Sequence, residues 1–234
     1  MSDSVINDHY IHNILTRKRV TDELHIGGKF ATAHLLAALD LKPGQHVLDV
    51  GSGLGAAARL AAETYDVRVT GIDLVQGFVE EAVKNTDDAR VHFACGSALA
   101  MDFDDSAFDA SFMLHVNMNI EEKQKLFSEI ARVLRAGSLF GFYEILADIH
   151  AGAMVYPCPW AMKGADSFLA TPGEIETMLE VAGFAVIAKE NRRDFALDAM
   201  ERRQADYPEQ AFVNLLENVR AMRCVPWQYV CRKL

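Results

Sequence analysis

Residues 46–74 read HVLDVGSGLGAAARLAAETYDVRVTGIDL, and this stretch decides the fold. Its first five residues form an apolar run between Pro43-Gly44 and Gly51, which is typical of a buried parallel strand. Residues 55–64 are rich in Ala, Leu and Glu, which favour a helix. The segment VRVTGI then predicts a second strand. Strand, glycine-rich turn, helix and strand together predict the start of an α/β fold.

The same alternation continues along the chain. Further strands are predicted at RVHFAC (90–95), FDASFMLH (108–115), SLFGFYEIL (138–146), AVIAKE (185–190) and QYVCRKL (228–234), the last of them at the sheet edge. Helices are predicted at 77–85, at 120–137 with an end at Gly137, at 171–184 with Thr171 as cap and Gly183 as stop, and in a charged tract over 196–222. Strands separated by helices predict right-handed crossovers and a doubly wound sheet.

The composition excludes some classes of partner. The 234 residues carry 23 Lys and Arg against 33 Asp and Glu, a formal net charge of −10, with no basic tract. Binding to nucleic acid or to an anionic membrane needs a basic face, so neither is expected. The amino terminus does not resemble a signal peptide, and no apolar run approaches the length of a membrane span. Four scattered cysteines predict reduced thiols in a cytoplasmic protein, and no residues have a convincing metal-ligand spacing.

The glycine-rich turn fits two cofactors. Glycines at 51, 53 and 55 let backbone approach a ligand and leave open N–H groups, and Gly51, Gly53 and Ala56 match the dinucleotide pattern G-x-G-x-x-A. However, Asp49 precedes the glycines, where a carboxylate suits an ammonium and a sulfonium and would repel a pyrophosphate. Asp73 ends the second strand, where it can bind both ribose hydroxyls. These features favour S-adenosylmethionine over a nicotinamide dinucleotide.

At this point the sequence resembles the class I S-adenosylmethionine-dependent methyltransferases over almost its whole length. VLDVGSGLG is similar to their first motif, GIDL to their acidic second motif, CGSALAMDFDDSAFDASFMLHV to the adenine-side loop and fourth strand, and EIARVLRAGSLFGFYEI to the following helix and strand. HIGGKFATAHLL, HVNMNI, YPCPWA and SFLATPGEIETMLEVAGF resemble a small-molecule branch. That branch contains glycine–sarcosine, dimethylglycine and phosphoethanolamine N-methyltransferases and quinone C-methyltransferases.

The resemblance implies a set of cofactor-binding residues. They are Asp49, Gly51, Ser52, Gly53 and Gly55 at the methionine moiety, Asp73 and Leu74 at the ribose and adenine, Ser97 and Ala98 beside the adenine, Gly28 in the amino-terminal lid, and His115 on the methyl side. Two departures from the family stand out. Ser97 occupies a position where the family usually has an acidic residue, and RAGS replaces the usual PGG turn.

Several polar and aromatic residues are candidates for the acceptor side. His115 ends the fourth predicted strand, where an imidazole either forms part of the pocket wall or acts as the general base. Asn117 and Asn119 are either turn formers or ligands of the substrate. Trp160 either packs in a lid or faces a cationic acceptor. The lid positions Tyr10 and His25 complete the predicted substrate-binding set.

These observations predict a single Rossmann-like domain with a seven-stranded, mostly parallel sheet whose last strand is antiparallel. Residues 1–40 form a helical lid, 41–146 the cofactor-binding core, 147–171 a substrate-side insertion and 172–234 the carboxy-terminal half of the sheet. The expected activity is methyl transfer from S-adenosylmethionine to a small molecule, most simply an amine, without a metal, by a monomer or homodimer. A C- or S-methyltransferase acting on a quinol or thiol, a nicotinamide-dependent oxidoreductase, and a cofactor-binding protein without activity remain as alternatives.

Overall fold

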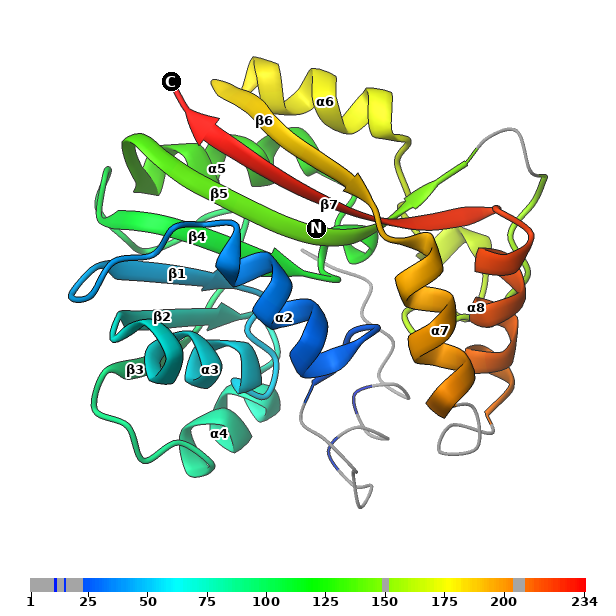
Figure 1. The fold of residues 1–234 in the computed structure, drawn as a ribbon, viewed down its shortest axis with the longest axis horizontal. Helices are drawn as coiled ribbons and strands as arrows, with labels where there is room; N and C mark the ends of the chain where they lie inside the picture. The colour runs from blue at the N-terminus through cyan, green and yellow to red at the C-terminus, as the bar shows by residue number, and fades with distance from the viewer. Residues whose placement is uncertain (1–10, 12–14, 16–22, 149–151, 204–208) are drawn as a thin grey trace.

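The computed structural model describes residues 11, 15, 23–148, 152–203 and 209–234. In these ranges a seven-stranded sheet has the order β3-β2-β1-β4-β5-β7-β6 (Figure 1). The strands β1 to β5 pair in parallel, and β7 is antiparallel to both of its neighbours, β5 and β6. The predicted doubly wound fold, the mostly parallel sheet and the antiparallel last strand are therefore confirmed.

The elements follow the predicted alternation. The strands are β1 (His46–Val50), β2 (Arg68–Asp73), β3 (Val91–Cys95), β4 (Phe108–Leu114), β5 (Leu134–Ala147), β6 (Phe184–Asn191) and β7 (Cys224–Lys233). The described helices are α2 (Gly28–Ala37), α3 (Ala56–Tyr65), α4 (Gln76–Lys84), α5 (Lys123–Val133), α6 (Pro172–Val181), α7 (Arg193–Arg203) and α8 (Gln210–Arg220), with the short turns η1 (Asn117–Asn119) and η2 (Gly164–Asp166).

The predicted start and end of helix α6 are confirmed. The Thr171 hydroxyl accepts a hydrogen bond from the Glu174 amide, and the Glu174 carboxylate accepts one from the Thr171 amide, which forms a capping box. Pro172 occupies the first turn, where its missing N–H has no partner to lose. Gly183 follows the helix with a φ of 86°, a left-handed conformation that ends it.

Two details of the prediction are wrong. Strand β7 lies between β5 and β6, and β6 occupies the edge. Nearly all of β7 is buried, as its apolar sequence requires inside a sheet, whereas most of β6 is exposed. Helix α5 ends at Val133 rather than at Gly137, because Leu134 is already extended and pairs with Phe108.

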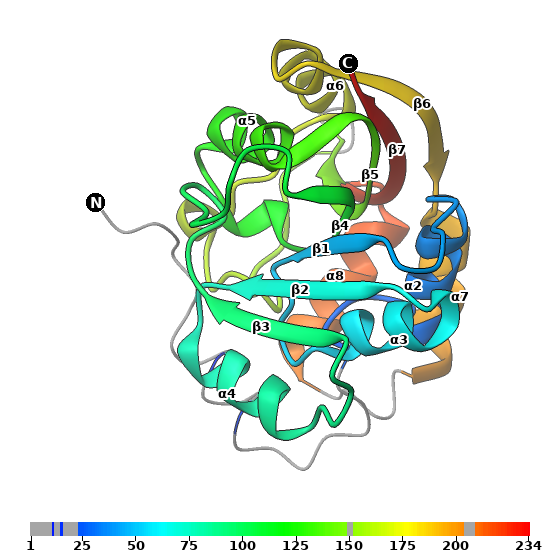
Figure 2. The same cartoon turned by 90° about the vertical axis from the view of Figure 1, so that its left-hand side faces the viewer.

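Three apolar clusters hold the described chain together. One packs α5 and α6 on one face of the sheet, and a second packs α2 and α3 on the opposite face (Figure 2). The third joins Trp160 and its neighbours to residues of α7, α8 and η1. The charged tract predicted over 196–222 is two helices, α7 and α8, which stand beyond the carboxyl ends of the parallel strands (Figure 1).

Candidate active site

The glycine loop between β1 and α3 has the geometry of a close-approach turn. Gly51, Gly53 and Gly55 have φ values of 71°, 51° and 78°. A Cβ on Gly51 would lie 2.2 Å from Val116 Cγ2, and one on Gly55 would lie 2.4 Å from Phe93 Cζ. The loop therefore needs glycine both for its backbone conformation and for space.

The amides of this loop are engaged, contrary to the prediction of open N–H groups. The amides of Gly51 and Ser52 donate to Ile72 O, and that of Gly55 donates to Ser52 O. These bonds tie the loop to the end of β2. What the glycines offer a ligand is a close approach to backbone rather than a row of free donors.

Asp49 is a buried carboxyl at the end of β1. It is 2% exposed, and its Oδ2 makes no hydrogen bond with any described residue. Burial, and to a lesser extent the charge of Asp73, hold the pKa of Asp49 well above its usual value. A cationic ligand group would supply the missing partner, so this residue fits the predicted ammonium and sulfonium. The Ser52 hydroxyl, also buried, has no partner in the described chain either.

Asp73 lies at the carboxyl end of β2 and organises two loops. Its Oδ2 accepts a hydrogen bond from the Gly53 amide at 2.8 Å, and its Oδ1 accepts one from the Val75 amide at 2.9 Å. Burial raises the pKa of Asp73, and the two amide bonds oppose that rise. A carboxylate has about four lone-pair positions, so two remain for the hydroxyls of a ribose.

The predicted adenine-side residues lie at the ends of β2 and β3. Leu74 is 38% exposed, as expected for a side chain that a ligand can cover. The Ser97 hydroxyl accepts a hydrogen bond from the Leu99 amide at 3.2 Å, and Ala98 packs against the first apolar cluster. In these contacts Ser97 stabilises the turn after β3.

His115 follows β4 with a φ of 55°, a strained conformation for a residue with a side chain. Its ring centroid is 6.0 Å from that of His25 and 4.9 Å from that of Tyr143, and its Nε2 is buried without a partner in the described ranges. Burial, followed by the proximity of His25, holds the pKa of His115 well below 6.5. The imidazole is therefore neutral at pH 7 and accepts or donates a hydrogen bond as a neutral ring.

The predicted lid residues His25 and Gly28 meet at the start of α2. His25 Nε2 lies 3.1 Å from Gly28 O and 3.0 Å from Thr32 Oγ1. Burial lowers the pKa of His25 to about 4. The turn thus places a second neutral imidazole against His115. The prediction for Tyr10 lies outside the described residues.

The loop after His115 is held by two buried titratable side chains, Glu144 and Lys123, that the sequence analysis missed. Glu144 accepts hydrogen bonds from the amides of Val116 and Asn117 at 2.9 and 3.1 Å. Lys123 Nζ donates to Asn117 O at 3.0 Å and also to Ile120 O. Burial raises the pKa of Glu144 to about 8 and lowers that of Lys123 to about 8. Lys123 lies in the helix predicted at 120–137 and Glu144 in the strand predicted at 138–146. Their spacing in the sequence does not indicate that they hold one loop together.

The remaining acceptor-side candidates differ in whether their polar atoms have hydrogen-bond partners. The side-chain amide of Asn117 is buried, and neither its nitrogen nor its oxygen has a partner in the part of the chain that is described. Asn119 instead donates to Val116 O at 3.3 Å, as a turn former does. Trp160 is 5% exposed in the third apolar cluster, and its Nε1 donates to Ser167 Oγ at 2.9 Å. Asn117 is thus the better placed of the three to bind a ligand.

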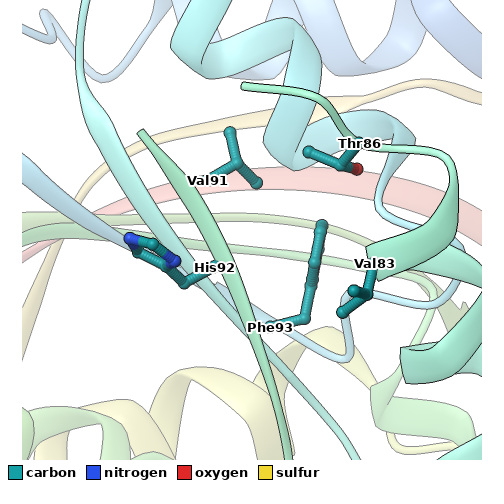
Figure 3. Close-up of a pocket in the computed structure, with 5 residues that line it drawn as sticks. All are labelled: Val83, Thr86, Val91, His92 and Phe93. Atoms are coloured by element: carbon teal, nitrogen blue, oxygen red, sulfur yellow. The ribbon is translucent and has the colours of Figure 1, made fainter. Parts of the chain in front are cut away.

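Other possible sites do not compete with this edge of the sheet. Within the described ranges, no three His, Cys, Asp or Glu side chains are grouped so that they could hold a metal ion. No described helix has the length and apolar character needed to cross a membrane. Figure 3 shows a pocket between α4 and β3, lined by Val83, Thr86, Val91, His92 and Phe93, none of them a predicted site residue.

Comparison with known proteins shows a methyltransferase domain. Residues 48–142 match the model of a methyltransferase domain. The chain is 30% identical over 201 residues to a phosphoethanolamine N-methyltransferase of Triticum aestivum, covering 84% of this chain and 39% of that protein. It is 28% identical over 182 residues to an O-methyltransferase of Aspergillus sclerotiorum, covering 74% of this chain and 67% of the relative. The chain therefore spans about two thirds of one relative and much less of the other.

A solved structure has the same fold. Phosphoethanolamine N-methyltransferase 2 of Haemonchus contortus, in complex with phosphomonomethylethanolamine and S-adenosylhomocysteine, superposes with a TM-score of 0.76 at 23% identity, covering 96% of this chain and 56% of that one. With the domain match, the strand order and the loop geometry, the chain belongs to the class I S-adenosylmethionine-dependent methyltransferases. The cofactor of this class is S-adenosylmethionine, and the buried Asp49, the glycine loop and Asp73 fit it.

Proposed function

We propose that the chain transfers a methyl group from S-adenosylmethionine to an amine of a small molecule. The observation that carries the proposal is the buried, unpartnered Nε2 of His115 beside the glycine loop. The residue after it, Val116, lies against Gly51, so the end of β4 that carries His115 adjoins the predicted methionine site. A neutral nitrogen acceptor at this place suits an N–H group of the acceptor.

The cofactor, when bound, supplies a methyl group activated by its sulfonium. The chain's own residues then need only hold the acceptor in line with that methyl and exclude water. Asp49 pairs with the cationic methionine moiety, and Asp73 accepts from the ribose hydroxyls. Residues 41–146 hold the cofactor in this proposal, while the lid, the 147–171 insertion and Asn117 form the acceptor side.

His115 orients the acceptor nitrogen. Because its pKa lies well below 6.5, it is a poor base for an ammonium but a good hydrogen-bond acceptor for a neutral amine. It accepts from the N–H, which directs the nitrogen lone pair at the methyl. The cofactor would supply the methyl group and retain the electron pair of the broken S–C bond. The proton of the methylated amine would pass to solvent, because the lowered pKa of His115 makes it a poor base for an ammonium. This modifies the general-base role that the sequence suggests.

A methyl-transfer screen with labelled cofactor tests the proposal. The panel contains amines, amino acids, quinols and thiols, and we expect label in the amines. His115→Ala should lower kcat by about a hundredfold, the order of loss expected when the acceptor is no longer held in line with the methyl group. His115→Gln keeps an acceptor atom and should lose less. Label confined to quinols or thiols would overturn the amine assignment, and label confined to macromolecules would overturn the small-molecule assignment.

The named relatives include N-, O- and C-methyltransferases, so transfer to oxygen or carbon is the main alternative. Calorimetry with S-adenosylhomocysteine and with NAD tests the alternative of a nicotinamide-dependent oxidoreductase. Binding of NAD but not of S-adenosylhomocysteine would overturn the proposal. A cytoplasmic location and a monomeric or dimeric state remain predictions from the composition.

A further inference from the structure

Two buried polar side chains direct their hydrogen bonds at the loop after β4. Glu144 accepts from the amides of Val116 and Asn117, and Lys123 Nζ donates to the carbonyls of Asn117 and Ile120. Both side chains are buried. Burial of a carboxyl and an amine costs free energy that an apolar pair of the same size would avoid. Their presence therefore calls for an explanation beyond packing.

The loop has few backbone bonds of its own. It is built on η1, a single 3₁₀ turn, in which the Asn119 amide donates to Val116 O and the Ile120 amide donates to Asn117 O. The middle of the turn also accepts a bond from the Phe168 amide. Isolated 3₁₀ turns are short and have poor hydrogen-bond geometry. Among the described residues, the two buried side chains supply most of the hydrogen bonds that tie this turn to other elements.

The two side chains reach the loop from two elements, β5 and α5, which lie beside each other (Figure 2). Strand β5 pairs with β4 as far as Leu114 and Tyr143, so Glu144 is the first residue of β5 beyond the end of β4. Lys123 is the first residue of α5. Burial lowers the pKa of Lys123 and raises that of Glu144, and the charge of each opposes the shift at the other, so they lie within electrostatic reach.

The loop that they hold contacts the glycine loop. The three atoms nearest to a Cβ on Gly51 all belong to Val116, at 2.2, 3.0 and 3.2 Å, so this side chain packs directly on Gly51. On its other side the glycine loop is tied to β2, because the amides of Gly51 and Ser52 donate to Ile72 O. Hydrogen bonds thus fix the glycine loop toward β2, and the packing of Val116 supports it toward β4.

We propose that Glu144 and Lys123 are positioning residues for cofactor binding. They hold the backbone of the loop after β4 so that Val116 keeps Gly51 in the conformation that admits S-adenosylmethionine. Neither side chain touches the cofactor, and both act through Val116. The inference rests on the proposed placement of the methionine moiety at the glycine loop and is independent of the methyl acceptor.

Calorimetry with S-adenosylhomocysteine on the full chain tests this proposal. Lys123→Met keeps the length of the side chain and removes its donors, and Glu144→Gln keeps the shape and one of two acceptors. We expect the Kd to rise at least fivefold in both variants. Lys125→Met and Glu180→Gln are the matched controls, because they make the same changes at exposed positions on α5 and α6, and their Kd should stay within twofold of wild type.

A double-mutant cycle distinguishes positioning from a general loss of structure. Val116→Ala removes the two methyl groups that pack on Gly51. If Lys123 acts through this contact, adding K123M to V116A should change the Kd less than twofold. An equal rise in the V116A and wild-type backgrounds would overturn the proposal. So would an unchanged Kd in K123M and E144Q.

A measurement on wild type keeps the test independent of how the variants fold. By linkage, a cofactor that binds the held loop must stabilise that loop. The amides of Val116 and Asn117 should therefore exchange with deuterium at least fivefold more slowly when S-adenosylhomocysteine is saturating. Unchanged exchange would overturn the positioning role while leaving the methyltransferase proposal standing. Failure of wild type to bind S-adenosylhomocysteine would overturn both.

Discussion

Asp73 and Gly53 are joined by a 2.8 Å hydrogen bond from the glycine amide to the carboxylate, which ties the end of β2 to the loop after β1. One side chain thus shapes the loop and presents its remaining lone pairs to a ligand. If Asp73 holds the ribose and the glycine loop holds the methionine moiety, as we propose, this bond couples the two sites, because a change at Asp73 alters both.

Asp73→Ala should therefore weaken cofactor binding more than the loss of one ribose contact would. Hydrogen bonds to charged groups contribute about 1.5–3 kcal/mol, which corresponds to a roughly 10- to 150-fold rise in the Kd for S-adenosylhomocysteine. Calorimetry measures this Kd. Asp104→Ala, which removes a carboxylate from an exposed position, is the control. An unchanged Kd in D73A would show that the ribose lies elsewhere.

Cofactor binding should release a proton from Asp49. The pKa of this carboxyl is raised by burial in the free protein, and a cationic ligand favours the ionised form and lowers it. The affinity for S-adenosylmethionine should accordingly rise with pH up to the raised pKa and then level off. Calorimetry in two buffers of different ionisation enthalpy detects the proton, and Asp49→Asn should abolish both effects. Equal apparent enthalpies in the two buffers for wild type would contradict the placement of the cationic group.

Gly51→Ala should destabilise the fold and impair activity. The new Cβ would lie 2.2 Å from Val116 at a φ of 71°, and overpacking of this kind costs about 1–3 kcal/mol. Gly44→Ala is the matched control, since its φ is 82° but nothing lies within 4 Å of a Cβ there. Denaturant unfolding of both variants separates the cost of backbone conformation from that of the clash. Equal losses in the two variants would argue that Val116 can move away freely.

In the pH profile of kcat, the fall in rate on the acid side should occur well below pH 6.5. His115 loses its function when it is protonated, and its lowered pKa places that event in acid. Between pH 6 and 8 the wild-type rate should rise only with the fraction of neutral amine. The kcat of His115→Gln should lack the acid limb, because an amide does not titrate. An inflection near 6.5 in wild type that disappears in this variant would restore the general-base role.

The contribution of Glu144 to stability should fall as pH rises from about 4.5 to about 8. An unfolded Glu144 loses its proton near 4.5, whereas the folded one keeps it until about 8, so the folded state binds more protons in this window and loses stability as they are removed. Glu144→Gln cannot titrate and should lack this component, although it is less stable throughout because one amide loses its acceptor. Urea unfolding at pH 5 and pH 7.5 compares the two slopes, and parallel slopes would contradict the raised pKa.

The sequence predicts the cofactor half of the molecule well, because its signals are local. Apolar runs, glycine turns and the carboxylates Asp49 and Asp73 follow one another within residues 46–74. The number of strands and the antiparallel last strand are predicted with the help of the family resemblance, but the strand order is not. The prediction places β7 at the edge because its pairing with β5 and β6 joins segments that are distant in sequence.

The residues on and around the proposed acceptor side are brought together by tertiary contacts, so fewer of them could be predicted from the sequence. Tyr143 looks like any strand residue, and Arg192 follows a strand without a motif. What distinguishes them is that Tyr143 Oη and Arg192 Nε are buried without a hydrogen-bond partner among the described residues. For Trp160, the sequence leaves open whether it packs in a lid or faces a cationic acceptor, and the structure shows it packed in the third apolar cluster with its indole N–H bonded to Ser167.

Helix α8 and the segment before Trp160 are joined by side-chain hydrogen bonds, and both share an apolar cluster with α7. Asn218 on α8 bonds to both the amide and the carbonyl of Val155, and Asn214 bonds to Pro157 O. Their apolar cluster is distinct from the two that cover the sheet faces. We expect this assembly, which contacts the sheet through Ile145 of β5 and Cys224 of β7, to open as one cooperative unit while β1 and β4 remain folded. Its backbone amides should exchange with deuterium sooner than those of β1 and β4, and together, so that acceptor entry need not disturb the bound nucleoside.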